Sequence, residues 1–143
     1  MTFRCPLEAR DTAWIACEAN KVAQVVIARS ARYHHEHFPW ARIIEKYKDK
    51  AVFVGLDEEH GAFSTAFAKA GRIPHYKTEN FKQLAEVICG AELFIGNQSS
   101  PLAIAEGLKQ NVIQEIFMRD PNCMHPRPGA QYIFTPNVYL PDL

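Results

Sequence analysis

Residues 84–117 constrain the fold of this chain more than any other stretch of its sequence. They read LAEVICGAELFIGNQSSPLAIAEGLKQNVIQEIF, with apolar runs at 93–95 and 112–113 on either side of a polar turn and a helical pattern. This is the succession helix, strand, turn, helix, strand. Parallel strands need a crossover connection, usually a helix, so the stretch predicts part of a parallel α/β sheet.

The same alternation extends toward the amino terminus. Apolar runs at 22–28 (VAQVVIA), 51–56 (AVFVGL) and 73–76 predict three earlier strands, and apolar spacing predicts helices over 40–47, 58–70, 81–89 and 101–109. Near-continuous apolar strands are typical of sheets covered on both faces. We expect a doubly wound, Rossmann-like parallel sheet of about five strands in the order 3-2-1-4-5.

The two ends of the chain fit this pattern less well. A helix is expected around residues 12–19, and the proline-rich sequence from Met118 onward predicts an irregular loop and tail over 118–143. Residues 1–143 are expected to form a single domain whose core spans about 22–117.

Composition narrows the classes of partner. The chain has 16 Lys plus Arg and 16 Asp plus Glu, so it lacks the basic field that nucleic acid selects. No apolar run approaches the ~20 residues of a membrane span, and residues 2–10 carry too many charges for a signal peptide. The four cysteines form no CxxC pair. We expect a cytoplasmic protein with reduced thiols, no metal site and no nucleic-acid partner.

The polar turn before the last helix is a candidate anion site. Asn97, Gln98, Ser99 and Ser100 stand where a strand meets a helix, with Pro101 at the first helical position. The first amides of a helix lack intrahelical partners and lie at the positive end of its dipole. They therefore favour a phosphate.

The loop after the first strand is expected to face this turn. Ligands of doubly wound sheets bind where the strand order reverses, here between the first and fourth strands. Arg29, Ser30 and Arg32 lie in that loop and are candidate phosphate ligands, although a structural salt bridge is as good an interpretation of Arg29. Histidines 34, 35 and 37 lack the framework of a metal site and are expected to be solvated.

Two acidic positions complete the candidate site. Glu115 closes the fifth predicted strand, where a carboxylate is well placed to bind a ribose diol. Glu59 follows the second strand in the sequence GLDEEHG, in which Asp57 as a helix N-cap is the simpler interpretation of the acidic turn.

Several of these segments together resemble a known family. They are the strand and polar loop followed by Trp40, the VFVGL strand with its acidic turn, and the blocks LAEVICGAELFIGN and SSPLAIAEGL. The succession resembles the carboxyl-terminal half of GT-B glycosyltransferases of the heptosyltransferase type (glycosyltransferase family 9). The resemblance covers about residues 22–115, and the block at 84–108 is its most specific part.

The resemblance implies a domain that binds a nucleotide-sugar donor as substrate, without a further cofactor. Residues 97–100 would take the diphosphate, Arg32 would stand in the place of a phosphate-binding lysine, and Glu59 lies near an acidic donor-site position. A nucleoside diphosphate or nucleotide sugar is the implied partner.

The sequence also departs from the family pattern. The usual turn reads G-D-S-G-P, whereas this chain has Asn97 and Gln98 and no glycine before Pro101. The amino-terminal acceptor domain of GT-B enzymes is absent from these residues, so an acceptor domain or a second copy would have to complete the enzyme. Two functions remain open: a glycosyltransferase donor half, or a non-catalytic module that binds a phosphate, a nucleotide or a protein. A flavodoxin-type flavin site is a weaker alternative, because the first loop lacks a phosphate-binding Ser/Thr/Gly sequence.

Overall fold

The computed structural model describes residues 11–121 and 124–143. The expectation about a signal peptide at 2–10, and the cysteines Cys5 and Cys123, therefore lie outside the described residues. Cys17 and Cys89 are free thiols. No helix in the described parts of the chain is both long and apolar enough to cross a membrane.

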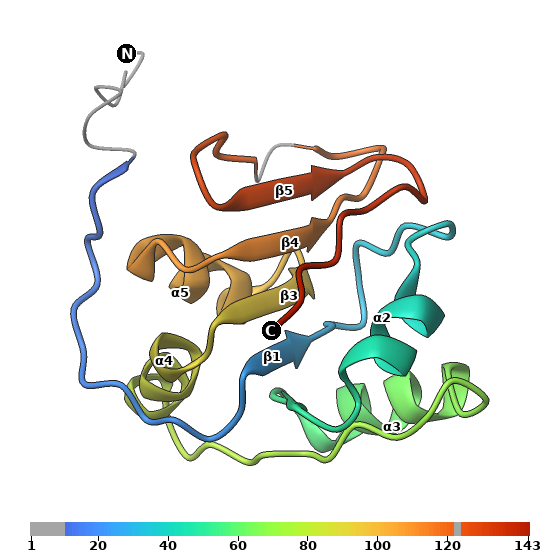
Figure 1. The fold of residues 1–143 in the computed structure, drawn as a ribbon, viewed down its shortest axis with the longest axis horizontal. Helices are drawn as coiled ribbons and strands as arrows, with labels where there is room; N and C mark the ends of the chain where they lie inside the picture. The colour runs from blue at the N-terminus through green and yellow to red at the C-terminus, as the bar shows by residue number, and fades with distance from the viewer. Residues whose placement is uncertain (1–10, 122–123) are drawn as a thin grey trace.

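A parallel sheet of five strands organises the molecule (Figure 1). The strands are β1 (Val25–Ala28), β2 (Ala51–Phe53), β3 (Leu93–Asn97), β4 (Val112–Glu115) and β5 (Ala130–Ile133). They pair in the order β2-β1-β3-β4-β5, and every pairing is parallel. The predicted α/β class and the reversal of strand order beside the first strand are confirmed.

Two regions differ from expectation: the predicted third strand at 73–76 and the tail at 118–143. The segment at 73–76 forms a single parallel bridge, between His75 and Phe53, instead of a strand. Pro74 has no amide to donate to a ladder, which limits this edge to one residue. Conversely, the tail expected to be irregular contains β5, which pairs with β4 from Ala130 to Ile133.

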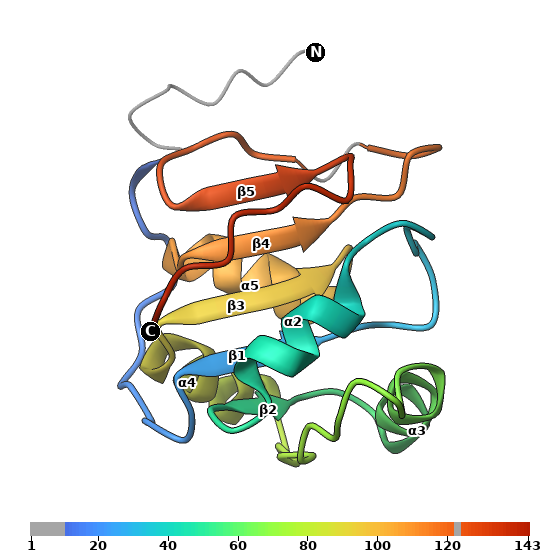
Figure 2. The same ribbon diagram turned by 45° about the vertical axis from the view of Figure 1, so that its right-hand side comes forward.

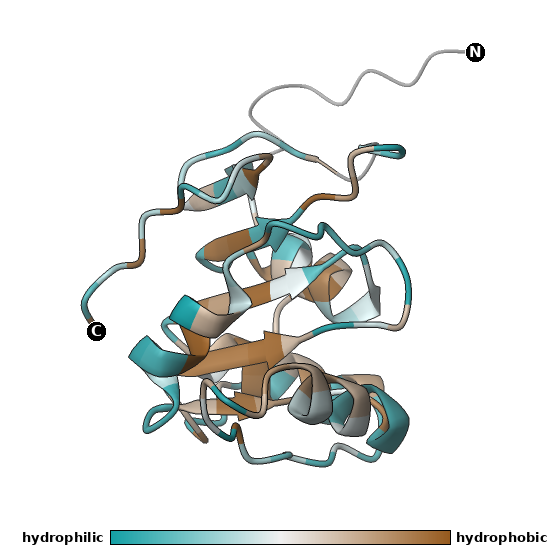
Figure 3. Cartoon of the chain, turned by 90° about the vertical axis from the view of Figure 1, so that its right-hand side faces the viewer, coloured by the Kyte–Doolittle hydropathy of each residue, from teal (hydrophilic) through white to brown (hydrophobic). Residues whose placement is uncertain are grey.

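Helices cover both faces of the sheet (Figure 2). The helices α2 (Trp40–Tyr47) and α3 (Asp57–Ala66) pack on one face, and α4 (Phe81–Gly90) and α5 (Ser100–Leu108) pack on the other. Helix α3 ends at Ala66, before the predicted end at residue 70, with Phe67 as its C-cap in place of Gly71. Apolar residues concentrate in the central strands between these layers (Figure 3).

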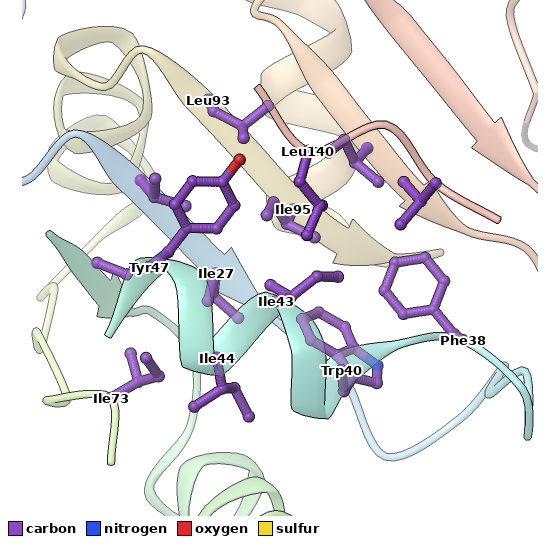
Figure 4. Packing of buried hydrophobic residues seen from close by; sticks show 14 of the residues in the cluster. Ile27, Phe38, Trp40, Ile43, Ile44, Tyr47, Ile73, Leu93, Ile95 and Leu140 are labelled. Carbon is purple, nitrogen blue, oxygen red and sulfur yellow. The ribbon is translucent and has the colours of Figure 1, made fainter. Parts of the chain in front are cut away.

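The core on the α2 face combines a helix with the carboxyl-terminal tail. Trp40, Ile43 and Tyr47 project from α2 toward Ile27 and its neighbours in the sheet (Figure 4). Val138 and Leu140 from the tail pack in the same cluster, so the tail covers the part of the sheet that α2 leaves open. The irregular tail therefore completes this layer of the fold.

The expectation of an amino-terminal helix at 12–19 is wrong, since residues 12–20 form no helix and run as an extended segment (Figure 1). The amides of Trp14 and Ile15 donate to the carbonyl of Gly107 at the end of α5, at 2.9 and 3.0 Å. The amide of Asn20 donates to the carbonyl of Glu86 in α4, at 2.8 Å. These bonds to two helices replace the local bonds that a helix would need.

Candidate functional site

A pocket of about 530 Å³ opens at the carboxyl ends of β1 and β3, where the strand order reverses. Its walls come from the loops after β1, β2 and β3 and from the start of α4. This volume lies in the range of small-molecule sites, and the position is where doubly wound sheets bind ligands. The lining residues are Ala28, Arg29, Ser30, Arg32, Gly55, Leu56, Glu59, Thr78, Glu79, Asn80, Phe81, Leu84, Gln98, Ser99, Ser100 and Pro101.

Most of the predicted binding residues line this pocket, namely Arg29, Ser30, Arg32, Glu59, Gln98, Ser99 and Ser100. Asn97 and Glu115 are fully buried and do not line the pocket. The contacts of each side chain show whether it holds the loops in place or is accessible to a ligand.

Asn97 ties the loop after β1 to the end of β3. Its Oδ1 accepts hydrogen bonds from the amide of Ser30 at 2.9 Å and from the Ser30 hydroxyl at 3.3 Å. Its Nδ2 donates to the carbonyls of Ser30 and Arg32. Both ends of the amide are thus used by the chain itself, and Asn97 acts as a positioning residue of the site.

Glu115 is a buried anchor whose surroundings do not suit the expected contact with a ribose. Its two oxygens accept from Arg29 Nε and Nη2, both at 2.9 Å, from Trp40 Nε1 at 3.0 Å and from the His35 amide at 2.8 Å. The Arg29 guanidinium also lies over the rings of Trp40 and Phe67. Arg29 therefore makes the salt bridge that was the alternative interpretation, and its charge is compensated.

Arg32 presents an uncompensated positive charge at the pocket. It is exposed and makes no ion pair with any residue in the described ranges, and its guanidinium lies 5.3 Å from the ring centre of Tyr33. Tyr33 has a φ of 63°, a left-handed conformation that is rare for a bulky residue. Such strain is retained where the surrounding structure enforces a particular loop shape.

The start of α5 also lines the pocket. Ser99 is the N-cap residue with extended backbone, and its hydroxyl donates to the carbonyl of Asn97 at 3.0 Å. Pro101 occupies the second helical position and has no amide, which leaves the amides of Ser100 and Leu102 as donors of the first turn. These amides and the helix dipole favour an anion at this end.

Gln98 connects the turn before α5 to the loop after β4. Its Nε2 donates to the carbonyl of Asp120 at 2.7 Å, and its Oε1 accepts from the amide of Phe117 at 3.2 Å. The loop after β4 is thereby fixed to the turn that begins α5.

Glu59 supplies a carboxylate on the β2 side of the pocket. Its Oε2 accepts from the amide of Leu56 at 3.0 Å, in the manner of a capping box. Gly55 has a φ of 138°, and a Cβ there would lie 2.7 Å from that same oxygen. Glycine at 55 thus allows the carboxylate to fold back over the end of the strand.

A polar cluster supports this wall. Asp57 forms an ion pair with Lys77 at 2.8 Å and contacts His75 Nδ1 at 3.3 Å, while His75 Nε2 lies 2.9 Å from the carbonyl of Gly55. The hydrogen bond from Lys77 lowers the pKa of the Asp57 carboxyl below its usual value.

Sequence reasoning missed the wall formed by residues 78–81. Thr78, Glu79, Asn80 and Phe81 lead into α4, with Asn80 as the N-cap that accepts from the amide of Gln83 at 3.0 Å. Phe81 is 69% exposed although it is a large apolar residue at the rim of the pocket. The start of α4 lies on the same edge of the sheet as the phosphate turn, and this position was a signal in the sequence that could have identified the wall.

No group of three His, Cys, Asp or Glu side chains in residues 11–121 and 124–143 is placed to hold a metal ion. Comparison with protein-family models, curated proteins and solved structures finds no match for this chain.

Proposed function

We propose that the pocket between β1 and β3 binds a nucleoside diphosphate or nucleotide sugar, as the donor half of a glycosyltransferase of the heptosyltransferase type. The observation that carries this proposal is that Arg32 and the start of α5 line the same cavity. A guanidinium and free helix amides are both groups that recognise phosphate oxygens.

The remaining walls suit the rest of such a ligand. The side chains of Glu59 and Glu79 offer acceptors for sugar or ribose hydroxyls, away from the phosphate-binding side. Leu56 and Phe81 are 65% and 69% exposed at the rim, and an aromatic ring there offers a stacking surface for a base. The diphosphate would lie between these two regions.

A second candidate is a nucleotide-binding module without transferase chemistry, and the surroundings of Asn97 favour it. The acid usual at this turn is replaced by an amide whose Nδ2 donates to the carbonyls of Ser30 and Arg32. A carboxylate cannot donate these bonds. The turn is therefore adapted to hold the loop, and a transfer step would depend on groups supplied by a partner.

A ligand panel distinguishes these functions. Thermal unfolding is measured with ADP, UDP, GDP and CDP and with the corresponding nucleotide sugars, and turnover is followed by release of the diphosphate. Both proposals expect stabilisation by one nucleotide class, because a ligand that binds the folded state raises the melting temperature. Sugar transfer after addition of a candidate partner supports the enzyme, and binding with no turnover supports the module. If no nucleotide stabilises the chain at millimolar concentration, both proposals are wrong.

A further inference from the structure

A second cavity of about 510 Å³ lies at the carboxyl ends of β4 and β5, and no part of the proposed function uses it. Residues 34–37 from the loop after β1, residues 117–119 after β4 and residues 134–136 after β5 form its walls. We call this cavity the histidine pocket. The two cavities share no lining residue.

The expectation that the loop histidines are solvated is wrong for His35, whose buried imidazole lines the histidine pocket. His35 is 8% exposed, and its amide donates to Glu115 Oε1 at 2.8 Å, which anchors its backbone. Its Nδ1 accepts from the amide of His37 at 3.1 Å. A neutral ring that accepts at Nδ1 carries its proton on Nε2. No residue within 11–121 or 124–143 accepts a hydrogen bond from that nitrogen, so His35 has one donor left for a ligand in the pocket it lines.

The other lining groups define the chemistry of the ligand. Arg119 is exposed and forms no ion pair with any described residue. Glu36 also lines the pocket, and its Oε1 lies 3.2 Å from His37 Nε2. Phe117 and Phe134 provide aromatic walls, and Phe134 is 39% exposed. The pocket thus combines N–H donors and a positive charge with apolar surface.

We propose that the histidine pocket binds a small organic acid with a flat, apolar ring. The carboxylate accepts from His35 Nε2–H and from the Arg119 guanidinium, since charge-assisted bonds of this kind are the strong ones in proteins. The ring packs against Phe117 and Phe134, as aromatic groups line most small-molecule sites.

Amide chemical shifts measured by NMR during titration with benzoate test this site. We expect saturable amide shifts centred on residues 34–37, 117–119 and 134–135. We also expect about tenfold weaker binding in Arg119→Gln and several-fold weaker binding in Phe134→Ala. Benzamide, which lacks the charge, and acetate, which lacks the ring, are each expected to bind at least about fivefold more weakly than benzoate.

Matched variants separate this site from the nucleotide pocket. Arg72→Gln removes an exposed arginine and Tyr139→Ala an exposed aromatic ring outside both cavities, and neither should alter benzoate binding. Arg32→Gln should also leave it unchanged, so failure of nucleotide binding and failure of benzoate binding are independent results. His35→Gln is expected to abolish benzoate binding. Because that change can disturb the buried loop, Arg119→Gln and Phe134→Ala are the deciding variants. Shifts outside these residues, equal binding of benzamide, or insensitivity to both Arg119→Gln and Phe134→Ala would overturn the proposal.

Discussion

At the scale of single residues, the polar groups at the strand ends divide into those that hold the chain and those left for a ligand. The side chains of Asn97 and Glu115 form hydrogen bonds with the loop after β1 and with α2. Arg32 makes no such bond through its guanidinium with a described residue and lines the cavity. The buried pair of anchors therefore sets the loop shape from which Arg32 projects.

Asn97→Asp tests the anchoring role of the amide. The aspartate keeps an acceptor for the Ser30 amide but loses both donated bonds and places a charge at a position with no exposed surface. We expect a loss of about 2–4 kcal/mol in the free energy of unfolding, measured with urea. Asn137→Asp, an exposed counterpart, should change it by less than about 0.5 kcal/mol. Equal stability of Asn97→Asp and the parent chain would contradict the anchoring role.

Glu115→Gln tests whether the buried carboxylate is structural. The change leaves Arg29 without its counter-charge, and breaking a buried pair costs roughly 3–5 kcal/mol. Glu45→Gln on the exposed side of α2 is the control and should be nearly neutral. In the fraction that remains folded, nucleotide affinity should stay within about twofold of the parent value, or about 0.4 kcal/mol, because Glu115 does not line the pocket. If Glu115→Gln were as stable as the parent chain and lost nucleotide affinity, the structural role would be wrong and the expected contact between Glu115 and a ribose would be supported.

The sequence identifies Glu115 as the end of a strand but does not fix which face receives its side chain. Side chains alternate along β4, so Glu115 shares the α2 face with Ile113, while Val112 belongs to the α4 and α5 face. The strand end was predictable from the apolar run, whereas the burial of this carboxylate depends on Trp40 and His35, which are distant in sequence.

At the scale of elements, two helical glycines have opposite environments. A Cβ at Gly90, the last residue of α4, would lie 2.1 Å from the backbone oxygen of Asn20, whereas a Cβ at Gly61 in α3 meets no atom within 4 Å. We expect Gly90→Ala to destabilise the protein by roughly 1–3 kcal/mol, because the extended segment at 12–20 must move away from α4.

Gly61→Ala is the matched control for this prediction. Alanine is the better helix former, so this change should stabilise the protein by about 0.5–1 kcal/mol. Urea unfolding of the two variants measures both effects. The contact between the amino-terminal segment and α4 would be refuted if Gly90→Ala were as stable as Gly61→Ala.

The elements that sequence reasoning identified are those with strong local patterns. The central strands are continuous apolar runs, and α2 presents Trp40, Ile43, Ile44 and Tyr47 at helical spacing. By contrast, β5 is a four-residue edge strand whose first three residues are only half-buried, so its sequence carries little periodic signal. Its pairing with β4 comes from tertiary packing that a local pattern does not contain.

At the scale of the whole molecule, the carboxyl-terminal tail closes the α2 layer. Tyr47 is buried, and its hydroxyl donates to the carbonyl of Pro141 at 2.6 Å. Lys46 Nζ donates to the carbonyl of Leu140 at 2.9 Å, and Lys50 Nζ to an oxygen of Leu143. Burial raises the pKa of the Tyr47 hydroxyl from 10.0 to about 12, and the charge of Asp142 adds to the effect.

This raised pKa predicts a loss of stability at alkaline pH. The neutral phenol is favoured in the folded state, so its contribution is complete below pH 10 and declines as the pH rises from 10 to about 12. The decline in the free energy of unfolding should total roughly 2–3 kcal/mol over this window. Tyr47→Phe should remove the share of this pH dependence that comes from Tyr47 and leave the share of Tyr132, whose pKa burial likewise raises to about 12. Tyr139→Phe, which changes an exposed tyrosine, should retain the full decline. Equal alkaline slopes for the two variants would show that Tyr47 is not the responsible group.

Both cavities open along the carboxyl edge of the sheet, and the loop after β1 contributes to each. Contacts continue from one to the other, because Arg32 lies over Tyr33 and the Tyr33 ring meets Phe117 edge-on at 5.7 Å. The central claim of this account is that Arg32 and the start of α5 form an anion site at the reversal of strand order.

Calorimetric titration of the stabilising nucleoside diphosphate into Arg32→Gln and Arg72→Gln tests that claim most directly. Loss of one charge-assisted contact to phosphate should weaken binding by about 10- to 100-fold in Arg32→Gln, while Arg72→Gln, an exposed arginine outside the pocket, binds like the parent chain. Equal affinities of the two variants would contradict the claim and would place any nucleotide site elsewhere on the molecule.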